Sequence, residues 1–102
     1  MINIRSILKL KDNDGLTLKK GKPICYKTGY QVATEGVECA TARSAIDAVK
    51  SYGGDCGVWF FNNCYFVDKC HRVSTKKAAI EEGKAHSQIS IFDWKKQDCV
   101  YL

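Results

Sequence analysis

Four side chains that bind metals in other proteins lie close together in the middle of the chain: Cys56, Cys64, Cys70 and His71. Zinc takes four thiolate or imidazole ligands in a tetrahedron. Paired zinc ligands usually lie roughly two to four residues apart on a tight turn, and these spacings differ from that pattern. Adjacent residues of a strand also point to opposite faces, which would separate Cys70 from His71. We therefore expect neither a metal nor a cofactor.

Nucleophilic catalysis by a cysteine needs a histidine base within hydrogen-bond reach and a third group that orients the histidine. The only histidines are His71 and His86. In a strand His71 would face away from Cys70, and His86 is expected to pack at the edge of a helix. The sequence also has no carboxylate pair and no glycine-rich phosphate loop. We therefore expect a protein that is not an enzyme.

The formal net charge of +5 comes mainly from lysine. Such a charge favours an acidic partner, either nucleic acid or an acidic protein surface, although ordinary solvated charge explains it equally well. Direct reading of bases relies on the bidentate fork of arginine, and the chain has few arginines. They are Arg5, Arg43 and Arg72. The pattern suits non-specific electrostatic attachment better than sequence recognition.

Aromatic residues provide a second candidate binding feature. Residues 58–61 read Val-Trp-Phe-Phe and residues 64–67 read Cys-Tyr-Phe-Val, so both strands would be apolar on both faces. One helix covers one face of a sheet, and the other face needs the rest of the chain, a homodimer mate or a partner. Aromatic residues are mostly core residues, but any that stay exposed mark an interaction surface. The candidate binding residues are Lys27, Trp59, Phe61, Tyr65, Arg72, Lys76, Lys77 and Trp94.

The elements that would position these residues occur twice. In residues 24–50 and again in 59–84, strands with a Tyr-x-Val motif precede a threonine and a helix with Ala-Ile at a fixed spacing. The matched residues are Tyr30, Val32, Thr41, Ala45, Ile46 and Lys50 in the first copy and Tyr65, Val67, Thr75, Ala79, Ile80 and Lys84 in the second. One residue is missing from a loop of the second copy. A duplicated unit predicts an α+β fold in which each unit packs one helix on antiparallel strands.

The helices have clear start and stop signals. Thr41 is predicted to cap a helix over 42–52 that ends at Gly53-Gly54, and Ser74 or Thr75 is predicted to cap a helix over 76–86. The second helix would bury a stripe of Ala79, Ile80, Gly83 and His86. A glycine inside a helix costs about 1 kcal/mol relative to alanine. We therefore predict that another group approaches the backbone at Gly83 closely, and we expect an aromatic side chain.

The strands are predicted from alternation and turn residues. Residues 2–10 are expected to form a strand or extended arm, with a turn at 12–15 and a return strand at 16–20. Further strands are expected at 24–26, 30–34, 37–40, 57–61, 64–68, 71–73, 89–94 and 99–102, with turns at 28–29, 35–36 and 62–63. The 102 residues would form a single domain: an N-terminal hairpin or arm (1–22), the first repeat (23–54), and the second repeat with terminal strands (55–102).

No apolar run approaches the length that crosses a bilayer, and the N-terminus lacks the long apolar segment of a signal peptide. We therefore expect a cytoplasmic protein that does not associate with a membrane. In that compartment the six cysteines would be reduced, and those in or beside strands would behave as small hydrophobic residues. The cysteines assigned to strands or strand ends are Cys25, Cys39, Cys64 and Cys70.

Strands followed by a helix that begins Thr-x-x-x-Ala, at Thr41 and again at Thr75, resemble the small integrase-arm and AP2-like DNA-binding domains. The resemblance covers each repeat and implies a sheet face that enters the major groove. Those domains present arginine and polar groups to the bases, whereas these strands carry Cys, Phe and Trp. The residues placed for phosphate contact are Lys27, Arg72, Lys76 and Lys77.

The last third of the chain, through residues 65–68, 71–79 and 88–94, is similar to small phage and prophage proteins. That resemblance implies a phage accessory protein, and many of these act stoichiometrically on host machinery, as anti-CRISPR and other anti-defence inhibitors do. We therefore expect a non-enzymatic binding protein that occludes a host nucleic-acid-handling or defence complex, protein or ribonucleoprotein, in the host cytoplasm. Lysines would steer association, and aromatic residues would supply affinity. The alternative is a small basic module that binds DNA or RNA directly.

Overall fold

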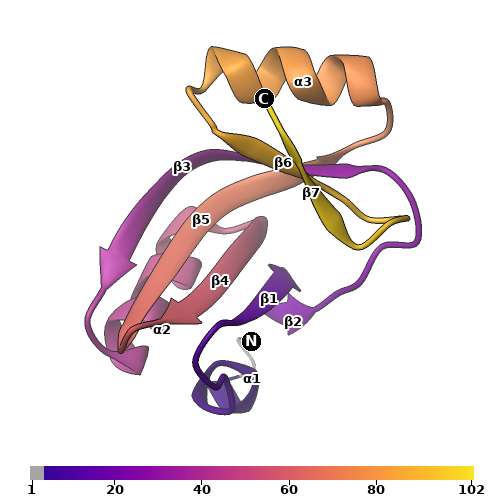
Figure 1. Ribbon diagram of the computed structural model, residues 1–102. Coiled ribbons are helices and arrows are strands. Elements are labelled where there is room, and N and C mark those ends of the chain that lie inside the picture. Colours follow the sequence, from indigo (N-terminus) through magenta and orange to yellow (C-terminus); the bar gives the residue numbers. More distant parts are fainter. Residues whose placement is uncertain (1–3) are drawn as a thin grey trace.

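One antiparallel sheet holds all the strands of the computed structural model, which describes residues 4–102 (Figure 1). The helices are α1 (Ile4–Leu8), α2 (Ala42–Tyr52) and α3 (Lys76–Ala85). The strands are β1 (Asp14–Lys19), β2 (Lys22–Pro23), β3 (Tyr30–Cys39), β4 (Asp55–Phe61), β5 (Cys64–Val73), β6 (Ser90–Asp93) and β7 (Asp98–Tyr101). Their order in the sheet is β2-β1-β4-β5-β3-β6-β7. The α+β fold class is therefore confirmed.

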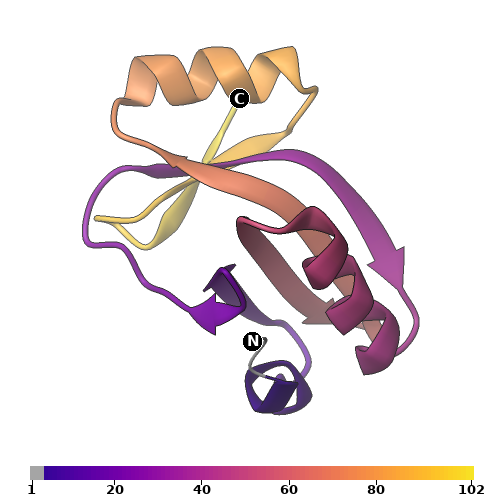
Figure 2. The ribbon, with the colours of Figure 1, turned by 180° about the vertical axis from the view of Figure 1, so that it is seen from behind.

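The sheet curls around the two long central strands, β3 and β5. Helix α3 lies across the end of the sheet that carries β6 and β7, and α2 lies behind the other end, as the view from behind shows (Figures 1 and 2). The face that carries the helices is called the outer face, and the opposite face, which the curl partly encloses, is called the inner face. Gly36, in the middle of β3, belongs to a continuous strand, so the turn expected at 35–36 is wrong.

A β-bulge in β3 decides which residues point outward. The pairing shifts between Ala33 and Glu35, so Thr34 is the extra residue that faces no single residue of β5 in the register. An extra residue reverses the alternation of side chains beyond it. Val32 therefore points to the same outer face as Val67, and both side chains are fully buried. Without the bulge Val32 would lie on the inner face.

Each helix covers the long strand of the other half of the chain. Helix α2, which follows β3, packs mainly against β5, and α3, which follows β5, packs mainly against β3. Two hydrophobic clusters result. The larger lies under α1 and α2 and contains Ile7, Leu18, Cys39, Ala45, Ile46, Val49, Cys56, Val58 and Val67. The smaller lies under α3 and contains Val32, Ala79 and Ile91.

The caps of both long helices follow the prediction. The Thr41 hydroxyl accepts a hydrogen bond from the Ser44 amide at 3.1 Å, and the Thr75 hydroxyl accepts one from the Ala78 amide at 3.4 Å. These bonds satisfy amides that the first turn of a helix leaves free. Helix α2 ends at Gly53, which has a φ of 64°. Helix α3 ends at Ala85, so His86 is exposed and does not join the buried stripe.

The N-terminal region differs from the prediction. Residues 4–8 form helix α1 where a strand was expected over 2–10, and residues 2 and 3 lie outside the described part of the chain. Ile7 is fully buried and Leu10 packs against the same cluster, a spacing of three that suits a helical turn. Strand β1 pairs with β4 and with the short β2, so the hairpin of this region spans β1 and β2 and leaves out residues 4–8.

Residues 24–26 form no strand, because their side chains take part in other contacts. The Tyr26 ring lies edge-on to Trp94 with 5.4 Å between ring centroids, and its hydroxyl donates to Asp55 Oδ2 at 2.9 Å. The segment therefore bridges the two ends of the curled sheet. The two strands expected at 64–68 and 71–73 are one continuous strand, β5, and the turn between β4 and β5 lies at Asn62 and Asn63, as predicted.

Candidate binding site on the inner face of the sheet

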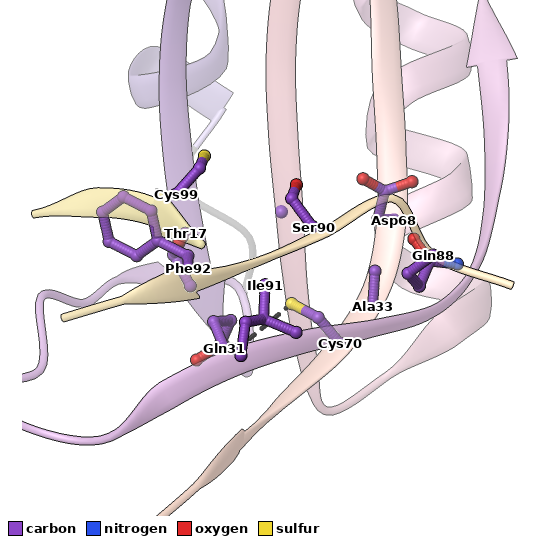
Figure 3. A pocket seen from close by; sticks show the side chains of 11 residues that line it. Thr17, Gln31, Ala33, Asp68, Cys70, Gln88, Ser90, Ile91, Phe92 and Cys99 are labelled. Atoms are coloured by element: carbon purple, nitrogen blue, oxygen red, sulfur yellow. Dashed lines mark hydrogen bonds between the residues drawn. The ribbon is translucent and has the colours of Figure 1, made fainter. Parts of the chain in front are cut away.

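A pocket of about 220 Å³ lies inside the curl, between β6–β7 and the strands behind them (Figure 3). Small curled sheets normally fill their interior with large side chains. Around this pocket the inner face carries several small residues, among them Thr17, Ala33, Gly57 and Ser90. A Cβ added to Gly57 would meet no atom within 4 Å. The pocket is therefore a direct result of missing side-chain volume.

Asp68 is the acidic residue of this pocket. It lies on β5 opposite Gly36 of β3, and its Oδ1 occupies the space that a Cβ on Gly36 would need. Burial raises the pKa of the Asp68 carboxyl, and no neighbouring cation opposes that shift. Within residues 4–102 the carboxylate accepts no hydrogen bond and forms no ion pair. Asp68 is thus a half-buried anion without a protein partner in the described chain.

The part of the pocket wall beside Asp68, on β5 and β3, is neutral and fixed. The Trp94 indole N–H donates to Gln31 Oε1 at 2.9 Å, and Gln31 Nε2 donates to Cys70 Sγ at 3.2 Å. All three residues are buried. Burial raises the pKa of the Cys70 thiol to about 12, which keeps the thiol protonated at neutral pH. Cys70 therefore contributes a neutral surface and not a nucleophile.

An aromatic surface continues the inner face beyond the pocket. It consists of Trp59, Phe61 and Phe66. Trp59 pairs with Phe66, and this is the next inward-facing pair along β4 and β5 after Gly57 and Asp68. The Trp59 ring stacks on Phe61, with centroids 5.0 Å apart and planes 14° apart, and lies 5.2 Å from Phe66. Trp59 and Phe61 are each 42% exposed. The Trp59 indole N–H donates to Asn13 Oδ1 at 3.2 Å, which fixes the ring.

Two of the predicted aromatic binding residues lie elsewhere. Tyr65 points to the outer face, where its ring lies 4.5 Å from Phe60 and packs against the cluster under α2. Trp94 is 5% exposed, because Tyr26 and Phe92 pack against it and Gln31 takes its N–H. Neither residue therefore lies on the aromatic surface: Tyr65 is on the outer face and Trp94 is buried.

The predicted basic residues lie far from the aromatic surface. Lys27, Lys76 and Lys77 are exposed at the α3 end of the sheet. Arg72 is engaged within the protein: Nε donates to the Thr28 carbonyl at 2.8 Å, Nη2 donates to the Thr28 hydroxyl at 3.1 Å, and the guanidinium lies over the Tyr26 ring. Along β5, Arg72 is about 20 Å from Phe66. The structure therefore does not bring the lysines and the aromatic surface together.

Sequence reasoning missed Asp68 and Asn13 as members of this face. The available signal was the pair of glycines inside strands, Gly36 and Gly57, because a strand glycine often marks close approach by another group. Among residues 4–102, no three His, Cys, Asp or Glu side chains come together as metal ligands. The His71 imidazole instead contacts Glu82 of α3, with 2.7 Å between Nε2 and Oε1.

No protein-family model, curated protein or solved structure matches this chain. In the described part of the chain, the helices are all too short or too polar to cross a membrane. What the protein does must therefore be argued from the geometry of the inner face.

Proposed function

We propose that this protein is a non-enzymatic binding protein that docks a partner protein on the aromatic surface of its inner face. The observation that carries the proposal is the stacked Trp59–Phe61 pair, of which each ring is 42% exposed. Tryptophan and other aromatic residues dominate the affinity of protein interfaces. Residues of this size are usually buried when they have no partner to meet.

The aromatic surface is rigid before any partner arrives. Asn13 holds the indole of Trp59, and the turn that carries Asn13 is fixed in turn because the Asn62 amide donates to Asp12 Oδ1 at 2.8 Å. A side chain that is already fixed loses little conformational entropy when it is buried by a partner. This supports a role for Trp59 as an anchor residue.

The partner we propose is a host nucleic-acid-handling or defence complex, which the protein would occlude stoichiometrically in the host cytoplasm, as phage-type inhibitors do. The net charge of +5 supports an acidic partner surface, since opposite charge raises the rate of association. The exposed lysines at the α3 end, Lys76 and Lys77, would steer the encounter without contacting the aromatic surface.

The test is capture of a partner from bacterial lysate, followed by affinity measurement with the purified partner. We expect Trp59→Ala and Phe61→Ala each to weaken binding by about tenfold or more, the usual effect of losing an anchor residue. Tyr101→Ala is the matched control, because Tyr101 is 79% exposed on β7, outside the aromatic surface. Equal affinity for all variants, with folding confirmed by circular dichroism, would exclude the aromatic surface.

A second candidate function is direct binding of single-stranded nucleic acid. Single-strand-binding proteins stack bases on exposed aromatic rings. Trp59 and Phe61 are exposed in the same way. Fluorescence anisotropy with labelled DNA and RNA at two salt concentrations distinguishes the candidates, because phosphate contacts give a steep salt dependence. Weaker binding by Lys76→Glu and Lys77→Glu variants would favour nucleic acid, whereas no binding at low salt would leave the protein partner.

We also infer that the two halves of the fold arose by duplication of one strand–helix unit. Three observations support this inference: the threonine caps are equivalent, Ala45 and Ala79 are both fully buried, and each helix covers the long strand of the other half. The bulge at Thr34 lies in the segment where the second copy is one residue shorter. A related sequence with two nearly identical halves would test the inference.

A further inference from the structure

We infer that the pocket between β5 and β6 is a binding site for a guanidinium group, with Asp68 as its counter-ion. The inference stands on the pocket alone and does not rest on the proposed function. Asp68 brings a carboxylate to a pocket of about 220 Å³ whose other lining residues carry hydroxyl, amide, thiol and apolar groups. The pocket therefore has one charge, and it is negative.

The burial of the Asp68 carboxylate and its lack of protein partners indicate that it binds a ligand. The side chain is half-buried and receives no hydrogen bond or cation from residues 4–102. A buried carboxylate without compensation is costly, and proteins normally surround one with donors. Gly36 of β3 has no side chain where the Asp68 carboxylate lies. Gly57 of β4, on the other side of Asp68, leaves the inner face of that strand open. An anion held at the edge of an open pocket is suited to a cation from outside.

The groups around Asp68 favour guanidinium over other cations. Guanidinium is planar, carries several N–H donors and binds a carboxylate through two parallel hydrogen bonds. The hydroxyls of Thr17 and Ser90 offer further acceptors, and so does Gln88 Oε1, since Gln88 Nε2 donates to the His86 carbonyl at 3.2 Å. Phe92 lines the other end of the pocket from Asp68 and adds an aromatic ring, a surface that suits a planar cation (Figure 3). An ammonium group holds its water more tightly, and a metal ion would lack ligands.

The positive charge of the whole protein does not prevent such binding. Charges farther away than the Debye length, about 8 Å at physiological salt, are largely screened. Arg72, which is also on the inner face, is held on Thr28 and the Tyr26 ring, and it lies about 13 Å from Asp68 along β5. Cys70 stays protonated and adds no charge. The field at the pocket is therefore negative and is set by Asp68, which lines the pocket, together with Asp55 on the neighbouring strand.

The test is a titration of the isotope-labelled protein, followed by NMR of the side-chain carboxyl carbons. The probes are agmatine, a free guanidinium compound, and a short neutral-ended peptide with a single arginine. We expect saturable shifts at the Asp68 carboxyl and at the Ser90 and Phe92 amides. The peptide with citrulline in place of arginine, which keeps the shape and loses the charge, should cause no shift. Because the wild-type carboxyl is observed directly, this test does not depend on any variant.

Asp68→Asn should weaken binding of either probe by about tenfold or more, since a charge-assisted hydrogen bond pair is lost. Glu38→Gln is the matched control: Glu38 lies on the same face, beside Phe66 and outside the pocket, and its loss should leave affinity unchanged. Binding of both probes supports a site for free or protein-borne guanidinium, and binding of the peptide alone supports an arginine of a partner protein. Absence of shifts with both probes, or undiminished binding by Asp68→Asn, would overturn the inference.

The result is separable from the proposed function. If Trp59→Ala abolishes partner capture while agmatine still binds, the two sites are independent and both stand. If agmatine fails to bind while Trp59→Ala still abolishes capture, only the guanidinium site is lost.

Discussion

The backbone of Gly83 in α3 lies against the side chain of Leu102 at the end of the chain. A Cβ added to Gly83 would lie 2.7 Å from Leu102 Cδ1 and 3.1 Å from Ile91 Cγ2. The close approach predicted from the sequence is therefore present, but the prediction of an aromatic neighbour is wrong. The glycine allows Leu102 to pack under α3.

We predict that Gly83→Ala and Leu102→Ala are strongly non-additive. In the wild-type background the gain in helix propensity, about 1 kcal/mol, is offset by the clash with Leu102. With Leu102→Ala already present, Gly83→Ala should raise the free energy of unfolding by at most about 1 kcal/mol, because Ile91 Cγ2, 3.1 Å from the new Cβ, must still give way slightly. Urea denaturation of the four proteins of the double-mutant cycle measures the coupling. Additive free energies would show that Leu102 does not restrict position 83.

Trp94→Phe should lower the free energy of unfolding by about 1–3 kcal/mol, because it leaves the Oε1 of buried Gln31 without its donor. The substitution keeps an aromatic ring against Tyr26 and Phe92, so the loss of the hydrogen bond dominates. Tyr101→Phe is the control, since it removes a hydroxyl from an exposed ring. Equal stability of Trp94→Phe and wild type in urea denaturation would mean that Gln31 finds another donor.

Asp68→Asn should stabilise the ligand-free protein at neutral pH and not at acid pH. Burial raises the pKa of the Asp68 carboxyl in the folded state above its unfolded value, about 3.9. The folded state therefore binds the proton more tightly, and its stability falls as pH rises through the folded pKa. Asparagine removes this penalty, so the difference in Tm should be present at neutral pH and vanish below the unfolded pKa. Melting curves across this pH range measure it, and a lower Tm for the variant at neutral pH would reveal a protein partner of the carboxylate.

The cysteines should differ widely in reactivity. Burial raises the pKa of Cys56 to about 11 and that of Cys70 to about 12, so both thiols are protonated and inaccessible at neutral pH. Cys25 and Cys99 are exposed. We expect a limiting amount of iodoacetamide to label Cys25 and Cys99 first, as measured by mass spectrometry of peptides. Labelling in urea gives the reference for unfolded protein, and native labelling of Cys70 as fast as Cys99 would contradict the packing described for the pocket wall.

Local signals in the sequence were enough to predict the two long helices and most strands. Threonine caps, Gly53 and the Asn62–Asn63 turn depend on interactions within a few residues, and these agree with the structure. The failures came from long-range contacts. Residues 4–8 form a helix because Ile7 meets the cluster under α2, and residues 24–26 leave the sheet because Tyr26 meets Trp94 and Asp55.

The candidate site was predicted only in part, and the reason is the curl of the sheet. Trp59 and Phe61 were identified from their residue type and are exposed. Tyr65 has the same chemistry, but it lies on a strand, and the face to which a strand residue points depends on register. Trp94 follows the end of β6 and is buried by Tyr26, Phe92 and Gln31. The pocket depends on β6 and β7 crossing strands that are distant in sequence, so Asp68 could not be recognised as a site residue from its neighbours.

Each helix packs mainly on the long strand of the other half of the chain. The order in which the ribosome makes these elements therefore decides when each helix can be covered. When residues 1–54 have emerged, α2 has already been made, but its main support, β5, ends at Val73 and is still to come. The apolar side of α2 must therefore wait in water, and the first half cannot complete a core of its own. The cluster under α2 can therefore close only after β5 has emerged, whereas α3, which is made later, meets a strand β3 that is already present.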